Sequence, residues 1–505
     1  MNQQVQNPKS SAIKNIPVAQ VLKLAGVSGF GDIFHKFVRI FTNIIVTRAI
    51  GASDFGLFSL GMTVVNMGAI IPRFGLPRSI TRFVAYYKGK EEEGKIPLVL
   101  RQALLISAGL GTATAVLIYH QAPRIALTLF HRGELSPIIR GLSPFIPFGI
   151  SGMVLLGTLQ GLKQIEKQVF IFDFLWPSVR LVLIIGFFLV GWKLYGLVAA
   201  VVLAVVVRFI VSFRVVSGQV SFWKPGTVPL PINELLFFSA PLFLANILSF
   251  ALNWTDTLML GYFREPAHVG IYMVSWRLSL IVSFPLAAFI NIFNPMAAEY
   301  IGKGDEPSLQ SLFQAVNHWI LAISLPMAII FFSFPGEILS MFGKEFKGGT
   351  WVVKALVMGQ LVNAASGPCG NVLIMKGWTW VNLINTSTMV AINFMLNLLM
   401  IPRWGMIGAA LATSLSLSLV NILRALEVGV FLKITPYKLG YLKPLLFALL
   451  ATIPLAILRN SSPLISLFLF IAIYFLLAFV LDIKGMKALN DLKKRTGGAY
   501  DRDET

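Results

Sequence analysis

The stretch GDIFHKFVRIFTNIIVTRAIG, residues 31–51, decides the fold, because it is apolar enough to cross a membrane yet carries five ionisable side chains. Polar residues recur there at steps of three and four, a spacing that places them on one face of a helix. Donors and acceptors that face lipid stay unpaired, so this face must meet other helices or water. Its members are Ser28, Asp32, Lys36, Arg39, Asn43 and Thr47.

The depth of Arg39 separates it from the other charges of this segment. If the helix begins near residue 26, Arg39 lies about 20 Å along it, at about 1.5 Å per residue. That position is beyond the middle of a hydrocarbon core roughly 30 Å thick, so the side chain does not reach the headgroups. We therefore expect Arg39 to face the protein interior, with His35 and Lys36 nearer the cytoplasmic end.

Composition assigns the whole chain to one class. Of its 505 residues, 56% are hydrophobic and 13% are charged, whereas a soluble chain is nearer half apolar and a quarter charged. Long apolar runs recur and alternating strand patterns do not, which predicts an all-α integral membrane protein with about fourteen transmembrane helices. The predicted spans are residues 26–50, 55–76, 98–120, 141–162, 169–191, 194–216, 236–260, 269–294, 314–334, 351–374, 379–401, 405–431, 442–458 and 463–482. The sequence has no nucleotide-binding loop and no His/Cys metal spacing, so we expect neither cofactor nor metal.

The net charge of +20 has a simple explanation in a membrane protein, because cytoplasmic loops collect Lys and Arg. No nucleic-acid partner is needed to explain it. The loop charges predict a multi-pass protein of the cell membrane whose N- and C-termini are both cytoplasmic. The predicted parts are an N-terminal arm (1–25), a first lobe of six spans (26–222), a second lobe of six spans (223–435), two extra helices (436–482) and a basic cytoplasmic tail (483–505).

The two lobes are predicted from an internal repeat. TRAIGASDFGLFSLGMTVVNMGAIIP (47–72) is similar to LMLGYFREPAHVGIYMVSWRLSLIVSFP (258–285), and YGLVAAVVLA (195–204) is similar to WGMIGAALAT (404–413), at nearly the same offset. Six spans separate the copies, and because six is even the halves have parallel orientation. This predicts a pseudo-twofold axis along the membrane normal and a cavity between the lobes.

Basic residues outnumber acids within the spans, and the deepest are Arg39, Arg180 and Arg277. Intramembrane charges are costly, so they are functional candidates. A basic cavity predicts an anionic ligand, and the planar donor fork of arginine favours a phosphate. Ion pairs such as Asp32 with Lys36, or Asp173 with Arg180, are the alternative explanation. Asparagines on the polar faces either line the cavity or hydrogen-bond between helices; they include Asn43, Asn66, Asn246, Asn253, Asn363 and Asn393.

Several segments resemble a known family. VTRAIGASDFGLFSLGMTVVNM (46–67), RFGLPRSITRFVAYY (73–87), TDTLMLGYFREPAHVGIYMVSWRL (255–278) and WGMIGAALATSLS (404–416) resemble spans 1–2, 7–8 and 12 of polysaccharide, or O-antigen-type, flippases. The resemblance covers roughly residues 20 to 480. That family belongs to the multidrug/oligosaccharidyl-lipid/polysaccharide exporter superfamily, which also contains lipid II flippases and MATE drug exporters.

The resemblance implies twelve core helices in two lobes, two extra helices and alternating access of a central cavity. The implied substrate is an oligosaccharide linked to polyprenyl phosphate or pyrophosphate, moved from the cytoplasmic to the outer leaflet for polysaccharide biosynthesis. It also implies that arginines grip the lipid phosphate, and Arg39 and Arg277 are the matching positions, with Arg180 a less direct match. In the lipid II branch the two extra helices form a groove for the polyprenyl tail; packing on the core is the alternative here.

We therefore expect a transporter and not an enzyme. In this hypothesis Arg39, Arg277, Arg180 and Lys36 hold the phosphate, the asparagines face the sugars, and Asp32 and Asp256 couple transport to a cation or proton. Enzymes of glycan biosynthesis are possible partners. A MATE-type cation or drug antiporter is the first alternative, but it predicts twelve spans and an acidic cavity. A membrane glycan polymerase or ligase is the second, but it predicts a large external loop.

Overall fold

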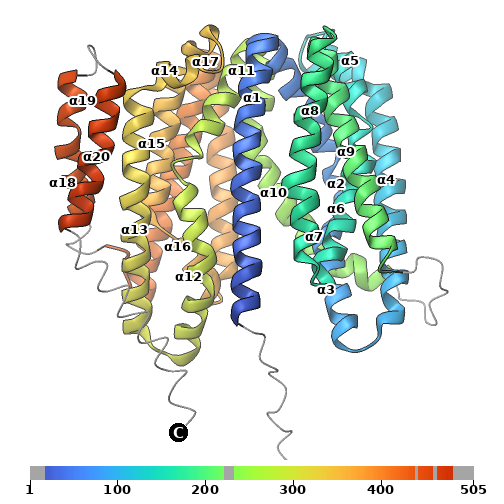
Figure 1. Ribbon diagram of the computed structural model, residues 1–505, viewed down its shortest axis with the longest axis horizontal. Coiled ribbons are helices and arrows are strands. Elements are labelled where there is room, and N and C mark those ends of the chain that lie inside the picture. The colour runs from blue at the N-terminus through green and yellow to red at the C-terminus, as the bar shows by residue number, and fades with distance from the viewer. Residues whose placement is uncertain (1–17, 221–231, 438–441, 459–462, 482–505) are drawn as a thin grey trace, which may run out of the picture. The chain divides into compact units, whose positions relative to one another are not determined.

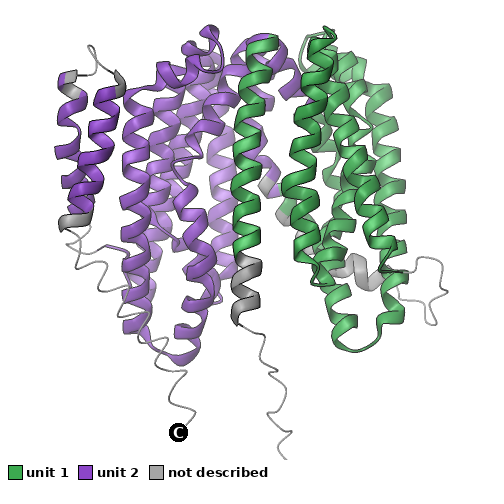
Figure 2. Ribbon diagram, in the orientation of Figure 1, with its two compact units in different colours: residues 1–50, 64–247 green, residues 51–63, 248–505 purple. Residues whose placement is uncertain are grey.

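The computed structural model describes residues 18–220, 232–437, 442–458 and 463–481, and every regular element within these ranges is helical (Figure 1). Contacts divide the chain into two compact units, residues 1–50 with 64–247 (unit 1) and residues 51–63 with 248–505 (unit 2) (Figure 2). In the described part, seven helices are long and apolar enough to cross a membrane, or eight if a bent pair counts as one span. Two of these long helices each hold two predicted spans. The prediction of an all-α membrane protein is confirmed.

Helix α1 (Val18–Gly68) shows how two predicted spans merge into one element. Gly51 interrupts its helical backbone with φ 80° and ψ 177°, between the predicted spans 26–50 and 55–76. The left-handed φ suits a glycine, which has no Cβ to clash. Beyond the break, the Ala52 amide donates to the Glu345 carboxylate at 2.7 Å, so a side chain satisfies one of the amides that a helix start leaves open. In α17 (Thr379–Leu432), Gly405 makes a similar break.

Unit 1 packs its helices around a core to which α3, α4, α6 and α9 contribute. Ile80, Leu100, Val154 and Leu159 are buried in that core. After α1 the elements are α2 (Ile70–Arg73), α3 (Leu76–Gly89), η1 (Glu93–Lys95), α4 (Ile96–Arg124), η2 (Ile125–Leu129), α5 (Leu135–Leu142), α6 (Phe145–Gly161), α7 (Ile165–Val169), η3 (Phe170–Leu175), α8 (Trp176–Leu189), α9 (Lys193–Ser217) and the first half of α10 (Ile232–Phe263).

One local irregularity of unit 1 matters for the site. The predicted span 169–191 is a helix whose residues 170–175 form a π-helical turn. Such a turn inserts an extra residue into the helix, and π-turns of this kind occur frequently at functional sites. Asp173 lies within this turn and Trp176 directly follows it, and both line a pocket together with α1.

Unit 2 contains two broken spans. The predicted span 269–294 is the pair α11 (Pro266–Ser279) and α12 (Phe284–Lys303), bent by 46° at the break. The predicted span 351–374 is broken at Gly367, with φ 68°, and Pro368. The other elements are α13 (Glu306–Ser333), α14 (Pro335–Ser340), η4 (Lys344–Gly349), α15 (Thr350–Ser366), α16 (Cys369–Met375), α17, α18 (Leu442–Ala451), α19 (Ile453–Leu458) and α20 (Pro463–Leu481).

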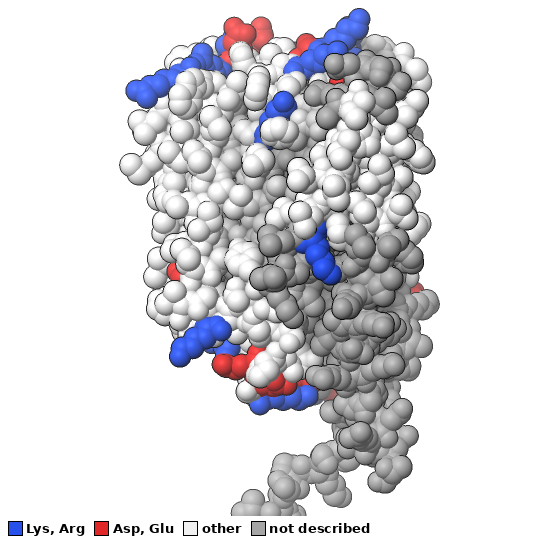
Figure 3. All heavy atoms as spheres, turned by 90° about the vertical axis from the view of Figure 1, so that its left-hand side faces the viewer, with Lys and Arg blue, Asp and Glu red and all other residues white. Residues whose placement is uncertain are grey.

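The two extra helices predicted at the C-terminal end pack against α13. Phe447, Phe470 and Tyr474 are buried together with Leu321 and Leu325. The hydroxyl of Tyr474 donates to the Ala322 carbonyl at 2.7 Å. Figure 3 views the side that carries these helices: its described surface is largely uncharged over the middle, and charged side chains lie mainly toward the two ends. That distribution fits a lipid-facing surface between two headgroup layers.

The structure does not describe two of the predicted segments in full. Most of the N-terminal arm, residues 1–17, and the basic tail at 483–505 lie outside the described residues. Between residue 18 and residue 25 the chain is already part of α1.

Candidate functional site

A pocket of about 340 Å³ lies within unit 1, between α1, the π-turn η3 and α8. Three of the four residues predicted to hold phosphate, Lys36, Arg39 and Arg180, line it together. The lining residues are Asp32, His35, Lys36, Arg39 and Thr42 from α1, Phe172 and Asp173 from η3, and Trp176, Pro177 and Arg180 from α8.

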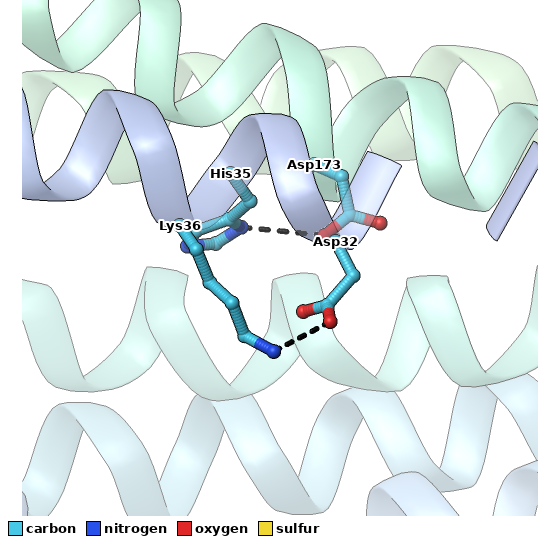
Figure 4. A network of polar contacts seen from close by, with 4 residues as sticks. All are labelled: Asp32, His35, Lys36 and Asp173. Atoms are coloured by element: carbon cyan, nitrogen blue, oxygen red, sulfur yellow. Dashed lines mark hydrogen bonds and ion pairs between the residues drawn. The ribbon is translucent and has the colours of Figure 1, made fainter. Parts of the chain in front are cut away.

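Both carboxylates of the pocket already have basic partners (Figure 4). Lys36 Nζ lies 2.6 Å from Asp32 Oδ2, one turn away on the same helix. His35 Nδ1 lies 3.3 Å from Asp173 Oδ1, which joins α1 to the π-turn. The Asp32–Lys36 pair is the one expected from the sequence. Asp173 pairs with His35, whereas the sequence suggested Arg180.

The two arginines of the pocket have no such partner. Within the described ranges, neither Arg39 nor Arg180 forms a hydrogen bond or ion pair, and Arg180 Nε is buried. Both arginines line the same pocket. Since Asp32 is held by Lys36 and Asp173 by His35, the pocket carries surplus positive charge. This is the electrostatic arrangement that an anion neutralises.

One wall of the pocket is aromatic. The centroid of the Trp176 ring lies 5.4 Å from that of Phe172 and 5.6 Å from that of His35. The guanidinium of Arg208, on α9, lies 4.7 Å from the Trp176 ring centroid. Arg208 is 3% exposed and donates to the Gly149 carbonyl at 3.2 Å. The indole is therefore held by a buried cation in a cation–π contact.

Arg277, the fourth predicted phosphate ligand, belongs to unit 2. It lies at the end of α11, half-buried, with its guanidinium 5.5 Å from the Phe55 ring centroid. It does not line the pocket of unit 1.

The six predicted asparagines have different surroundings. Asn43 is buried on α1, one turn beyond Arg39, while Asn66 and Asn246 are half-buried and Asn253 is exposed. Asn363 accepts from Asn421 at 3.0 Å. Asn393 donates to Thr413 and accepts from Asn397. For Asn363 and Asn393 the structure thus shows hydrogen bonds within unit 2, which was the alternative expectation.

Asp256 forms the centre of a buried polar network in unit 2. Its carboxylate accepts from the Tyr272 hydroxyl, from the Thr413 hydroxyl and, at 2.6 Å, from the Asn397 amide. Asp256 is 5% exposed and Asn397 is fully buried, with the Asn397 Oδ1 lacking a described partner. The two residues predicted to couple transport to an ion therefore have different surroundings. Asp256 is buried in a hydrogen-bonded network, whereas Asp32 is exposed and paired with Lys36.

Sequence reasoning did not find the aromatic wall or the His35–Asp173 contact. The sequence contains little indication that Trp176 belongs to a site, because an aromatic residue in an apolar span usually packs in the core. The π-helical turn that precedes it has no sequence signature of its own. Among the described residues, no group of three or more His, Cys, Asp or Glu side chains is placed so that it could hold a metal ion.

Known proteins resemble this chain at several levels. Over 430 residues it is 26% identical to the probable flippase AglR of Haloferax volcanii, covering 82% of this chain and 85% of the relative. It is 23% identical to the stage V sporulation protein B of Bacillus subtilis, covering 80% and 84%. The probable low-salt glycan biosynthesis flippase Agl15 of Haloferax volcanii matches 40% of this chain and 43% of its own length at 24% identity.

Solved structures share the fold. The lipid II flippase MurJ in an inward closed conformation superposes with a TM-score of 0.71 at 17% identity, covering 90% of this chain and 99% of that one. An inward-facing MATE family transporter of the MOP superfamily superposes with a TM-score of 0.67 at 15% identity, covering 78% and 93%. These likenesses place the fold among membrane transporters.

Two family models match the chain, and their matches overlap at residues 241–300. Residues 241–399 match the MatE family. Residues 21–300, more than half of the chain and all of the basic pocket, match the polysaccharide biosynthesis protein family. By that match the chain belongs to the family of polysaccharide biosynthesis proteins, as the resemblance of its first, second, seventh and eighth spans implied.

Proposed function

We propose that this protein is a flippase that moves an oligosaccharide linked to polyprenyl phosphate or pyrophosphate across the cell membrane, from the cytoplasmic to the outer leaflet, by alternating access. The observation that carries the proposal is the pair Arg39 and Arg180 in one pocket, without a carboxylate partner among the described residues.

The chemistry of the pocket supports a phosphate. Charged side chains inside a membrane protein are expensive and are kept where they serve transport or binding. Two guanidinium groups supply several donors to phosphate oxygens, and such charge-assisted hydrogen bonds are roughly twice as strong as neutral ones. Lys36 adds a third positive group at the same wall, partly neutralised by Asp32. Arg277 remains a predicted phosphate ligand in unit 2.

The named relatives support the same class of function. Two of them are described as flippases, one of them in glycan biosynthesis. A lipid-linked glycan combines the charged phosphate that the arginines suit with a lipid that stays in the bilayer. Transport of this kind requires no chemical step, so the absence of a catalytic grouping from the sequence motifs is consistent with it.

The main rival is a cation or drug antiporter, favoured by the MatE match over residues 241–399. A cationic substrate would be repelled by Arg39 and Arg180, because the nearby acids are already paired. A flippase of phosphate-linked lipids and a cation antiporter therefore differ in the sign of the charge on the ligand that the pocket binds.

For the driving force we propose coupling to a cation or a proton at Asp256. The hydroxyl oxygens of Tyr272 and Thr413 lie beside this buried carboxylate, and oxygens are the ligands that small cations prefer. Asp32, exposed and paired with Lys36, suits the role less.

We further propose that both termini are cytoplasmic and that enzymes of glycan biosynthesis are partners.

The test compares Arg39→Ala and Arg180→Ala with Arg101→Ala, an exposed arginine of α4 outside the pocket. We expect each pocket variant to bind a polyprenyl phosphate about tenfold or more weakly, as loss of a charged hydrogen bond predicts. Display of the exported glycan in cells should fall in parallel, while Arg101→Ala matches the wild type in both assays.

Native mass spectrometry of the purified protein provides an independent readout. We expect a co-purifying polyprenyl-linked sugar in the wild type and its depletion in Arg39→Ala. Undiminished glycan display at normal protein levels would refute the role of the arginines, and a bound drug cation would favour the antiporter.

A further inference from the structure

The aromatic wall of the pocket has no function in phosphate binding. Trp176 is the first residue of α8, and Arg180 follows it by one turn on the same helix. A ligand whose phosphate sits between Arg39 and Arg180 therefore has the Trp176 ring next to it. In a phosphate-linked glycan the neighbouring group is either the first sugar or the first isoprene unit of the lipid.

Arg208 supports the Trp176 ring from α9. It is 3% exposed, and within the described ranges its contacts are the Gly149 carbonyl and the indole face. A buried arginine costs free energy unless it is compensated. Its guanidinium lies over the Trp176 ring, which also contacts Phe172 and His35. Together these contacts hold the ring in one orientation, which suits a ring that meets a ligand.

The polar groups beside the ring favour a sugar over an isoprene unit. Asp173 lies one turn before Trp176 and uses Oδ1 for His35; its Oδ2 has no described hydrogen-bond partner. A sugar ring offers C–H groups on its faces and hydroxyl donors on its rim, whereas an isoprene unit offers no donor. The pocket of about 340 Å³ lies at the small end of the roughly 300–1,000 Å³ range of ligand sites, room for a phosphate and a sugar ring.

We propose that Trp176 is the stacking platform for the first sugar of the glycan, that Asp173 accepts a hydrogen bond from a hydroxyl of that sugar, and that Arg208 is the positioning residue of the platform. The inference rests on the proposed function, because it takes the phosphate at Arg39 and Arg180 as given. It makes the pocket selective for the sugar attached to the phosphate.

The experiment measures binding to the purified full-length protein in nanodiscs. The probes are farnesyl phosphate and farnesyl phosphate that carries one glucose, galactose or mannose. In the wild type we expect at least one hexosyl probe to bind about fivefold more tightly than farnesyl phosphate, an increment typical of one aromatic contact.

The variants separate the platform from the phosphate site. Trp176→Ala should abolish the sugar increment and leave farnesyl phosphate binding within about twofold of wild type, and Trp176→Phe should keep part of the increment. The control Trp192→Ala removes an exposed tryptophan of the same unit and should keep all of it. Arg208→Met should lose the increment and Arg208→Lys should restore part of it, since lysine also binds an indole face.

Three outcomes would overturn the inference. The first is a wild type that binds all four probes equally. The second is a sugar increment that survives undiminished in both Trp176 variants. The third is a Trp176→Phe variant that weakens all four probes equally, which would assign the ring to the lipid or the phosphate. Failure of the proposed function looks different: the wild type would not bind farnesyl phosphate, or Arg39→Ala would bind it as well as the wild type.

Discussion

Replacing Asp256 should destabilise unit 2. Its carboxylate accepts from Tyr272, Thr413 and Asn397 in a fully buried setting. In Asp256→Asn, an amide N–H₂ faces donors where an oxygen accepted before, so at least one donor loses its partner. A buried unpaired polar group costs about 1–3 kcal/mol, and we expect the thermal unfolding temperature in detergent to fall accordingly.

The matched control for Asp256→Asn is Glu299→Gln. Glu299 is exposed on α12 and pairs with Lys303 at 2.5 Å, and exposed pairs contribute about 0–1 kcal/mol. Its unfolding temperature should stay near the wild-type value. An Asp256→Asn protein as stable as this control, with unchanged transport, would show that the network is neither structural nor coupled to transport.

At the level of single residues, the sequence predicted the charged half of the pocket and missed the aromatic half. Depth along a helix singled out Arg39, because the cost of a charge in lipid depends on distance from the headgroups and can be estimated from residue number alone. In the structure Arg39 lines the pocket, but it is exposed, so the expectation that it faces the protein interior is not confirmed. Placing Trp176 in the membrane costs no comparable free energy, and an apolar ring can face lipid, pack in the core or contact a ligand. The partner of Asp173 was also out of reach, because the π-turn that directs it to His35 is a backbone feature.

The helices also show which features the sequence predicts and which depend on the backbone. Hydropathy predicted where apolar helices run, since the bilayer requires about 20 apolar residues. It treated the spans 269–294 and 351–374 as continuous, although both are broken. Hydropathy measures polarity, whereas a break depends on backbone dihedrals; the Gly367–Pro368 pair was the local signal for the second one. The first break, after Ser279, lies just before Pro285, the second residue of α12, which is a local signal of the same kind.

The contact between the second half of α1 and α11 depends on two glycines of unit 2. A Cβ added to Gly56 would lie 1.8 Å from the Pro266 carbonyl oxygen, and one added to Gly270 would lie 2.2 Å from the Ala52 oxygen. Backbones that approach this closely need small residues, as at other membrane helix interfaces. We expect Gly56→Ala and Gly270→Ala each to destabilise the protein by about 1–3 kcal/mol through overpacking.

Gly109→Ala is the control for these two variants. No atom lies within 4 Å of a Cβ added at this position on α4, so the substitution should leave stability unchanged or raise it slightly by the higher helix propensity of alanine. Unfolding temperatures in detergent provide the comparison. If Gly56→Ala and Gly270→Ala behave like Gly109→Ala, the close approach of α1 and α11 is wrong.

For the whole molecule, the sequence predicted class and family more securely than it predicted arrangement. Composition and apolar runs required an all-α membrane protein, and the segments around the 47–72 and 258–285 repeats carried the family resemblance. Orientation in the membrane rests on loop charges alone. The sequence predicts connecting segments at 86–95 and 121–140 on opposite sides of the membrane; the first, which includes Lys88, Lys90 and Lys95, and the basic tail weigh most toward a cytoplasmic placement.

Cysteine labelling tests this orientation, and the chain is well suited to it. Its single cysteine, Cys369, is fully buried and donates to the Ser366 carbonyl at 3.0 Å, so Cys369→Ser gives a cysteine-free background that keeps this hydrogen bond. Glu93→Cys and Glu134→Cys then introduce one exposed thiol in each loop. A membrane-impermeant maleimide should label Glu134→Cys in intact cells, and Glu93→Cys only after permeabilisation. The reverse pattern would place the termini outside and would reverse the proposed direction of transport through the basic pocket.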